Sequence, residues 1–313
     1  MTDLLCSLLS QADALLHATL VASTPLLLAA LGETAVQRTG VINIGLEGLL
    51  LLGAFAGAVG AYFTNSAIAG LLLGGLSGMF LALLFALFTQ CFQADQIVVG
   101  ISANLLAVGL TGALYRGLFG VTGQAITVPT LPAVAPPVLH TLPVIGPGVF
   151  QHTVLVYLAV FLVPLSHFFF FHTRAGLQVQ AVGEHPQAAE TLGIPVLVVR
   201  TAALLAEGLL GGLAGAYLSL AYANTFIEGM SAGRGFIALA IVIFGRWRPV
   251  GVLGGAIFFG AATALQFHLQ ALGSSVPYQF ILMLPYMLTL LALALSRAHI
   301  SPPAALGQPY RRE

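Results

Sequence analysis

Long apolar runs separated by short polar stretches dominate this sequence. A helix needs about 20 mostly apolar residues to cross the hydrocarbon layer of a membrane. Eight runs reach that length, at 12–31, 41–63, 67–90, 96–119, 152–172, 198–222, 249–270 and 277–296. A ninth apolar piece, 236–245, is about 15 Å long as a helix, because each residue adds 1.5 Å. That is half of a membrane, so the pattern predicts one broken or re-entrant helix among about 8–10 spans.

The composition agrees with this pattern. Hydrophobic residues make up 58% of the 313 residues, charged residues only 6%, and the mean hydropathy is +1.00. Soluble proteins are about one quarter charged, so the chain is an integral membrane protein. We predict an all-α, polytopic transmembrane helical bundle that forms a single transmembrane domain over residues 1–313.

Glycines four residues apart are frequent in the predicted spans. At this spacing, small residues lie on one helix face and allow two helix backbones to approach closely. The pairs and triplets are Gly53/Gly57, Gly70/Gly74/Gly78, Gly208/Gly212, Gly211/Gly215 and Gly251/Gly255. We expect a tightly packed helical core.

Arginine placement predicts the orientation, because cytoplasmic loops carry an excess of basic residues. Eight of the ten arginines can face one side, which we assign as cytoplasmic: Arg38, Arg174, Arg200, Arg246, Arg248, Arg297, Arg311 and Arg312. The proline-rich, uncharged loop 120–151 then faces outward as an ordered cap. The C-terminus lies inside and the N-terminus outside, unless a broken helix within 41–63 reverses the latter.

Several classes of function are excluded by what the sequence lacks. With no net charge and no lysine, it carries no surface for nucleic acid. The two cysteines make no metal or redox pattern, and the eight histidines, at span ends for the most part, read as interfacial or solvated. No nucleophile elbow, phosphate loop or zinc spacing is present. We therefore predict a protein that is not an enzyme and that binds no cofactor or metal of its own.

Polar residues inside the apolar runs are the candidates for function, since such residues are costly in a membrane. The segment 32–48 places Glu33, Arg38, Asn43 and Glu47 between two spans, although Glu33 and Arg38 also fit a simple cytoplasmic loop. The candidates for a substrate path are Asn43, Glu47, Asn104, Glu228 and Arg234, with Glu207 as a path residue or a structural one. Glu228 and Arg234 alternatively pair with each other in the outer loop.

The start of the half-helix 236–245 is a second candidate feature. A helix N-terminus presents free N–H groups and partial positive charge. We expect this end to meet a hydroxyl or carboxylate of a substrate. Three aromatic residues near the outer ends of spans, Phe119, Tyr222 and Phe226, are candidates to stack on a base at the entrance.

The longest hydrophilic stretch on the arginine side, 174–197, is predicted to contain a short helix. Pro186 suits a first helical turn, and Gly193 suits the C-terminal cap. We expect Ala188, Ala189 and Leu192 to form an exposed apolar stripe that needs a partner protein, because two helical turns are unstable alone. The alternative is a loop helix that lies on the membrane surface.

Several motifs together resemble one family. Residues 37–48 (QRTGVINIGLEG), followed by an apolar span, are similar to the permeases of ATP-binding-cassette (ABC) importers for simple sugars, nucleosides and branched-chain amino acids. The segment 181–194 resembles that family's coupling helix. Residues 94–100, 231–240 and 243–247 look most like the nucleoside branch, although Asp95 stands where many relatives have Asn. The resemblance covers about residues 20–295.

The resemblance implies a type II-like permease that forms the translocation path for nucleosides in the bacterial inner membrane. It implies a cytoplasmic ABC ATPase that binds ATP-Mg, a second and different permease, and an extracytoplasmic substrate-binding protein. The residues that match the coupling helix are Gly183, Glu184, Pro186, Ala188, Ala189, Leu192 and Gly193. The alternatives are a simple-sugar permease and, from the buried acids and broken helix, an ion-gradient-driven transporter.

Overall fold

Seven helices in the described part of the chain are long and apolar enough to cross a membrane. The computed structural model describes residues 2–120, 126–134, 146–271, 279–281, 283, 287–288 and 302–310. The long helices are α1 (Thr2–Gln37), α2 (Leu46–Thr64), α3 (Ala67–Ala86), α4 (Gln96–Phe119), α6 (Val154–His172), α9 (Val196–Tyr217) and α11 (Pro249–Ala271). A turn of π-helix extends α3 over Leu87–Cys91 and α9 over Leu218–Tyr222.

The shorter elements lie at the two ends of the bundle or between spans. The helices are α5 (Gly146–Phe150), α7 (Arg174–Glu184), α8 (Pro186–Thr191) and α10 (Arg234–Phe244). Two short strands, β1 (Ala133–Val134) and β2 (His152–Thr153), pair antiparallel, with Ala133 opposite Thr153. The predicted all-α polytopic fold is therefore confirmed.

The predicted spans agree with the helices apart from their ends. The predicted span 41–63 begins later, at Leu46, because residues 38–45 turn around Gly40, whose φ is +85°. The predicted span 277–296 lies for the most part outside the described residues.

Helix α10 confirms the predicted half-helix and shows that it belongs to a broken crossing. One end of this crossing is marked by Glu228, which pairs with Arg116 near the end of α4. The other end is marked by Trp247, which contacts Gln37 at the end of α1. Residues 223–233 between α9 and α10 are turns and bends. One crossing is thus half irregular chain and half helix.

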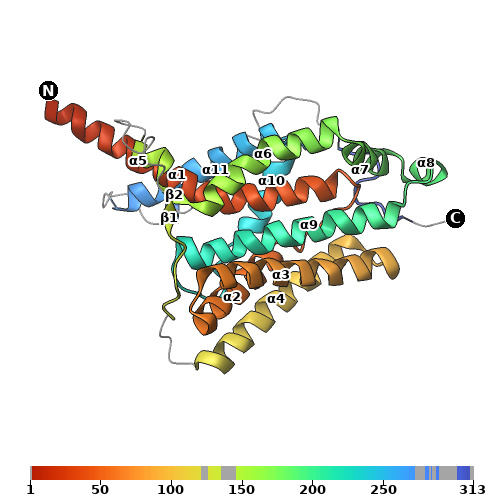
Figure 1. Ribbon diagram of the computed structural model, residues 1–313, viewed down its shortest axis with the longest axis horizontal. Coiled ribbons are helices and arrows are strands. Elements are labelled where there is room, and N and C mark those ends of the chain that lie inside the picture. The colour runs from red at the N-terminus through yellow and green to blue at the C-terminus, as the bar shows by residue number, and fades with distance from the viewer. Residues whose placement is uncertain are drawn as a thin grey trace.

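The two ends of the bundle differ in what they contain (Figure 1). The N-terminus lies at the end that holds α5, β1 and β2, and the C-terminal segment lies at the end that holds α7 and α8. The termini are therefore at opposite ends, as the arginine pattern predicts. We refer to the end with α7 and α8 as the arginine-rich end.

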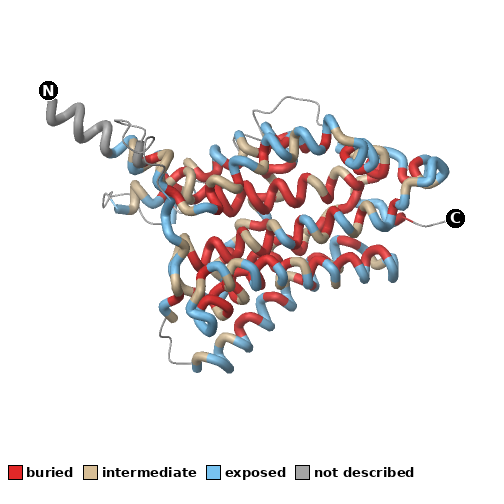
Figure 2. Tube along the Cα trace, in the orientation of Figure 1, coloured by how far each residue is buried: buried red, intermediate tan, exposed pale blue. Residues whose placement is uncertain are grey.

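Helices α1 and α9 run through the middle of the bundle, where buried residues gather (Figure 2). Helices α2, α3 and α9 cross through the predicted glycines. A Cβ atom added at Gly212 of α9 would lie 2.3 Å from the carbonyl oxygen of Gly74 in α3, and one added at Gly78 would lie 2.1 Å from the oxygen of Gly208. Only glycine permits these backbones to approach so closely.

We expect Gly212→Ala to lower the unfolding temperature of the detergent-solubilised protein. The new methyl group meets backbone that cannot move aside, and overpacking of this kind costs about 1–3 kcal/mol. The matched control is Gly109→Ala in α4, where an added Cβ has no neighbour within 4 Å. There the better helix propensity of alanine, about 1 kcal/mol, leaves stability unchanged or raised. Equal effects of both substitutions would contradict the close crossing.

At the end of the bundle that holds the N-terminus, His152 is buried, which corrects the expectation that all histidines are interfacial or solvated. Its ring stacks on His17 of α1 with the centroids 4.4 Å apart, and its Nε2 lies 2.9 Å from the carbonyl oxygen of Gly148. Asp13 of α1 accepts a hydrogen bond from the N–H of Gly148. Burial, which outweighs the hydrogen bond to Gly148, lowers the pKa of His152 below its ordinary value, and His17 lowers it further.

We expect the stability of the folded protein to fall as the pH falls below about 6.5, the ordinary histidine pKa. The unfolded chain then binds a proton at position 152 that the folded chain excludes, so unfolding takes up a proton and acid favours it. Thermal unfolding of wild type and His152→Gln between pH 8 and pH 5 measures the difference. If the unfolding temperatures of wild type and His152→Gln fell in parallel over this pH range, the result would contradict this role of His152.

Candidate functional site

Two of the predicted path residues, Asn43 and Asn104, hold the first turn of α2. The side chain of Asn104, from α4, accepts a hydrogen bond from the N–H of Gly48 at 2.8 Å and donates one to the oxygen of Ile44 at 2.9 Å. The side-chain oxygen of Asn43 accepts from the N–H of Gly45 at 2.9 Å. These N–H groups have no partner within α2, because the first turn of a helix leaves its donors unpaired.

Glu47, also in the first turn of α2, lies at the start of the half-helix α10. Its two carboxylate oxygens accept hydrogen bonds from the N–H groups of Gly233 and Gly235, each at 2.7 Å. The sequence led us to expect free N–H groups there, facing a substrate. That expectation is wrong for this conformation, since a carboxylate of the protein itself occupies the helix N-terminus, where negative charge is stabilised.

Glu33 and Glu207 form a buried polar cluster with Asn43, and the side chains of both acids are fully buried. The Asn43 amide donates to Glu207 at 2.8 Å, and the N–H of Asn43 donates to Glu33 at 3.4 Å. The amide of Gln37 donates to Glu33 at 2.7 Å and accepts from the indole of Trp247 at 2.6 Å. The cluster ties α1, α9 and the turn after α10 together. Asn43 itself is 1% exposed.

The two remaining path candidates, Glu228 and Arg234, do not pair with each other. Glu228 forms a salt bridge at 2.9 Å with Arg116, and both side chains are exposed. Arg234 donates instead to the carbonyl oxygens of Met230 and Ser231 and lies 5.4 Å from the ring of Tyr222. Arg234 thus shares the start of α10 with Glu47, whereas Glu228 stands at the C-terminal end of α4.

The aromatic candidates for an entrance are part of a larger cluster. Phe119 contacts Tyr62 and Tyr115, with centroid distances of 5.2 and 5.3 Å. Phe226 is buried and contacts Tyr115 at 5.2 Å and Phe55 at 5.4 Å. Phe226 is therefore a packing residue in this conformation, while Phe119 and Tyr222 stay partly exposed.

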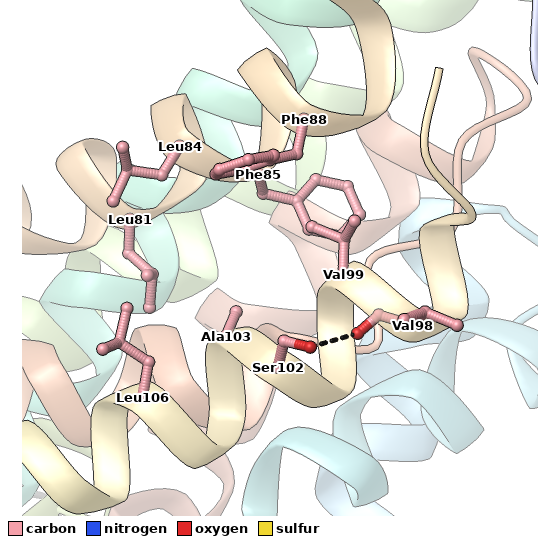
Figure 3. Close-up of a pocket in the computed structure, with 9 residues that line it drawn as sticks. All are labelled: Leu81, Leu84, Phe85, Phe88, Val98, Val99, Ser102, Ala103 and Leu106. Atoms are coloured by element: carbon pink, nitrogen blue, oxygen red, sulfur yellow. Dashed lines mark hydrogen bonds between the residues drawn. The ribbon is translucent and has the colours of Figure 1, made fainter. Parts of the chain in front are cut away.

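A cavity of about 250 Å³ lies between α3 and α4 (Figure 3). Leucine, valine and phenylalanine side chains line it, and its one hydroxyl, that of Ser102, already donates to the carbonyl oxygen of Val98. A polar substrate would find no free hydrogen-bonding side chain there, so this cavity is not a candidate for the substrate site. Among the described residues, no group of three or more histidines, cysteines or acids could hold a metal ion.

At the arginine-rich end, the predicted short helix is α8. Pro186 begins it, and Gly193 follows it with a φ of +82°. Two of the other matching positions, Gly183 and Glu184, instead end α7. A Cβ added at Gly183 would lie 2.1 Å from the carbonyl oxygen of Arg38, so α7 packs directly on the turn after α1.

The exposed face of α8 is narrower than the sequence indicates. Leu192 is 81% exposed and Ala188 is exposed, but Ala189 is only 3% exposed and packs with Val182, Val196 and Tyr310. The expectation of an exposed Ala189 is therefore wrong. This residue fixes α8 to the bundle, and Leu192 with Ala188 forms the exposed face.

Two contacts could not be predicted from the sequence. Arg116 is the partner of Glu228, and the only signal for it was a charge near the end of an apolar run. The pairing of Glu33 with Glu207 through Asn43 joins positions more than 160 residues apart, and no spacing rule connects them.

Comparison with known proteins agrees with this architecture. Residues 15–293 match the family model described as branched-chain amino acid transport system / permease component. The chain belongs to this family. It is a multi-pass permease of the cell membrane, in agreement with the seven apolar helices that are long enough to cross it.

The permease has relatives along nearly its whole length. The guanosine ABC transporter permease protein NupQ of Bacillus subtilis is 38% identical over 94% of this chain and 95% of its own. The nucleoside ABC transporter permease protein NupC of Lactococcus lactis is 36% identical over 93% and 94%. TsgC13 of Haloferax volcanii, a candidate glucose ABC transporter permease, is 36% identical over 97% and 99%. No solved structure gives a significant match.

Proposed function

We propose that this permease is the transmembrane subunit of an ABC importer for nucleosides. Nucleosides are supported as the substrate class by the sequence identity of 36–38% to guanosine and nucleoside permeases over more than nine-tenths of the chain. A nucleoside is uncharged and offers hydroxyls and base edges, which suit amide groups, hydroxyls and aromatic faces. The alternative is a simple sugar, which the similarity to TsgC13 favours.

In this proposal the chain works as a single permease domain beside a second, different permease. Bacillus subtilis supports the unlike pair, because a second guanosine permease from that organism, NupP, is also similar to this chain, at 26% identity over 76% of it. A binding protein outside the cell delivers the substrate. An ATPase inside the cell binds and hydrolyses ATP and docks on the exposed face of α8.

The polar residues divide into two roles along the proposed path. Glu228 and Arg234 face the outer half of the broken crossing, where they stay partly exposed and within reach of a substrate. Glu47, Asn43 and Asn104 hold the N-termini of α2 and α10, so they set the shape of the path wall. ATP-driven motion of α8 reaches this wall through α7, which packs on the turn after α1.

The test is uptake into proteoliposomes that contain the permease, its partner permease and the ATPase, with binding protein supplied on the outside. We expect uptake of radiolabelled guanosine or another nucleoside only with internal ATP. Uptake of glucose instead would move the substrate to the sugar class. A proton gradient that drives uptake without ATP, and whose collapse stops it, would overturn the ABC mechanism in favour of a secondary transporter.

A further inference from the structure

Three arginines surround a second cavity at the arginine-rich end of the bundle. The cavity measures about 240 Å³. Arg38 enters it from the turn after α1, and Arg246 and Arg248 enter it from the turn between α10 and α11. Glu184, at the end of α7, is the single acid in its lining. No salt bridge within the described part of the chain involves any of these arginines.

The protein holds Arg38 in place without neutralising it. Its Nε donates to the carbonyl oxygen of Trp247 at 2.7 Å, and its guanidinium lies 5.0 and 4.9 Å from the rings of Phe170 and Phe171. Burial, with a smaller effect of Arg248, lowers the pKa of Arg38 to about 10, so the group stays charged at neutral pH. The remaining guanidinium N–H groups of Arg38 are available to a ligand.

The turn that carries the other two arginines is held in a costly conformation. Arg246 and Trp247 both have a φ of +53°, and non-glycine residues keep such a strained conformation only where their surroundings impose it. The indole of Trp247, bound to Gln37, supplies that restraint. The same conformation directs Arg246 and Arg248 to the cavity that Arg38 lines.

Three guanidinium groups against one carboxylate give the cavity a net charge of about +2. Arginine binds phosphate strongly because its planar fork makes two parallel, charge-assisted hydrogen bonds to phosphate oxygens. The start of α11, at Pro249, adds the partial positive charge of a helix N-terminus next to Arg248. Exposed Phe168 and Phe171 at the end of α6 place apolar surface beside the cavity, as a membrane interface requires.

We propose that this cavity binds the phosphate group of an anionic membrane lipid, or of a small phosphate-bearing molecule, at the cytoplasmic surface. The bound phosphate neutralises the repulsion between Arg38 and Arg248. It also bridges the end of α1 and the α10–α11 turn, the two segments that Trp247 and Gln37 join. The site is separate from the exposed face of α8 and from the proposed substrate path.

The test measures thermal unfolding of the purified full chain in detergent while phosphatidylglycerol, phosphatidylcholine or inorganic phosphate is added. We expect phosphatidylglycerol to raise the midpoint and phosphatidylcholine to leave it unchanged. If inorganic phosphate raises the unfolding midpoint to the same extent, the site also binds small phosphates. If inorganic phosphate leaves the midpoint unchanged while phosphatidylglycerol raises it, the site is specific for the lipid headgroup. No rise with either anion would overturn the proposal.

Single variants separate this site from general surface charge. We expect Arg248→Gln and Arg246→Gln to weaken the apparent affinity for the anion about tenfold each, which corresponds to about 1.4 kcal/mol, because each removes a charged hydrogen-bond donor. The control is Arg174→Gln at the start of α7, which removes the same charge from the same end but does not line the cavity. An equal loss in the control would overturn the proposal.

A further variant tests whether the arginines serve the ATPase instead. Arg248→Glu is expected to abolish the response to phosphatidylglycerol and to leave copurification of the ATPase intact. Loss of the ATPase together with an unchanged response to the lipid would overturn the lipid site and assign these arginines to the ATPase interface.

Discussion

Replacing Leu192 by aspartate is expected to abolish ATP-driven uptake, by a factor of at least about 100, without reducing the amount of permease in the membrane. Leu192 is 81% exposed, so its replacement costs the isolated fold little. In the proposed complex the same side chain is buried against the ATPase, and an unpaired carboxylate in an apolar contact costs several kcal/mol. Each 1.4 kcal/mol is a factor of ten in binding.

The measurement is uptake in proteoliposomes, together with copurification of the ATPase. The matched control is Leu177→Asp in α7, which is 67% exposed at the same end of the bundle but lies outside α8. It is expected to keep near-normal uptake. Ala189→Asp is unsuitable for this purpose, because Ala189 is buried and its loss of function would report misfolding. Normal uptake by Leu192→Asp would refute the docking surface.

Replacing Glu47 by leucine is expected to destabilise the folded protein by about 3 kcal/mol or more, since two hydrogen bonds to a charged group are lost at about 1.5–3 kcal/mol each. The N–H groups of Gly233 and Gly235 would then lose their acceptors in a partly buried site, and a donor left unpaired there costs about 1–3 kcal/mol. We expect the start of α10 to loosen and transport to fall with it.

Thermal unfolding in detergent measures this effect, and hydrogen exchange at the start of α10 locates it. Glu228→Gln serves as the control, because it also removes a carboxylate but from an exposed ion pair with Arg116, and such pairs contribute about 0–1 kcal/mol. If both variants unfold at the same temperature, Glu47 does not hold α10 in the way that its contacts indicate.

The Glu47 contact also changes how the half-helix is understood. The sequence predicted the position of α10, since an apolar helix of half a membrane's length must start or end inside the membrane. It also predicted that the N-terminus of α10 is polar, because the first turn of a helix has N–H groups without partners in the helix. What it could not predict is that the N-terminus is occupied by a carboxylate from α2, 186 and 188 residues earlier in the chain. In the proposed transport cycle, a substrate at this end of the helix would have to share it with Glu47.

Features that depend on local composition could be predicted from the sequence. A span needs a fixed length of apolar residues whatever its neighbours are, so seven of the eight predicted spans appear as helices. Proline and glycine act through backbone conformation alone, and they placed α8 between Pro186 and Gly193. Glycines four apart marked the α2, α3 and α9 crossings, because their spacing follows from the helical repeat.

Which polar groups contact each other could be learned only from the packing of the helices. Glu228 pairs with Arg116 and not with Arg234, and Ala189 faces the bundle while Leu192 faces solvent. Such choices depend on the rotation and relative height of helices, and small shifts in either redirect a side chain to another partner. Because an unpaired polar group is so costly in a membrane, that geometry, rather than the residue types, determines which groups pair and which stay free for function.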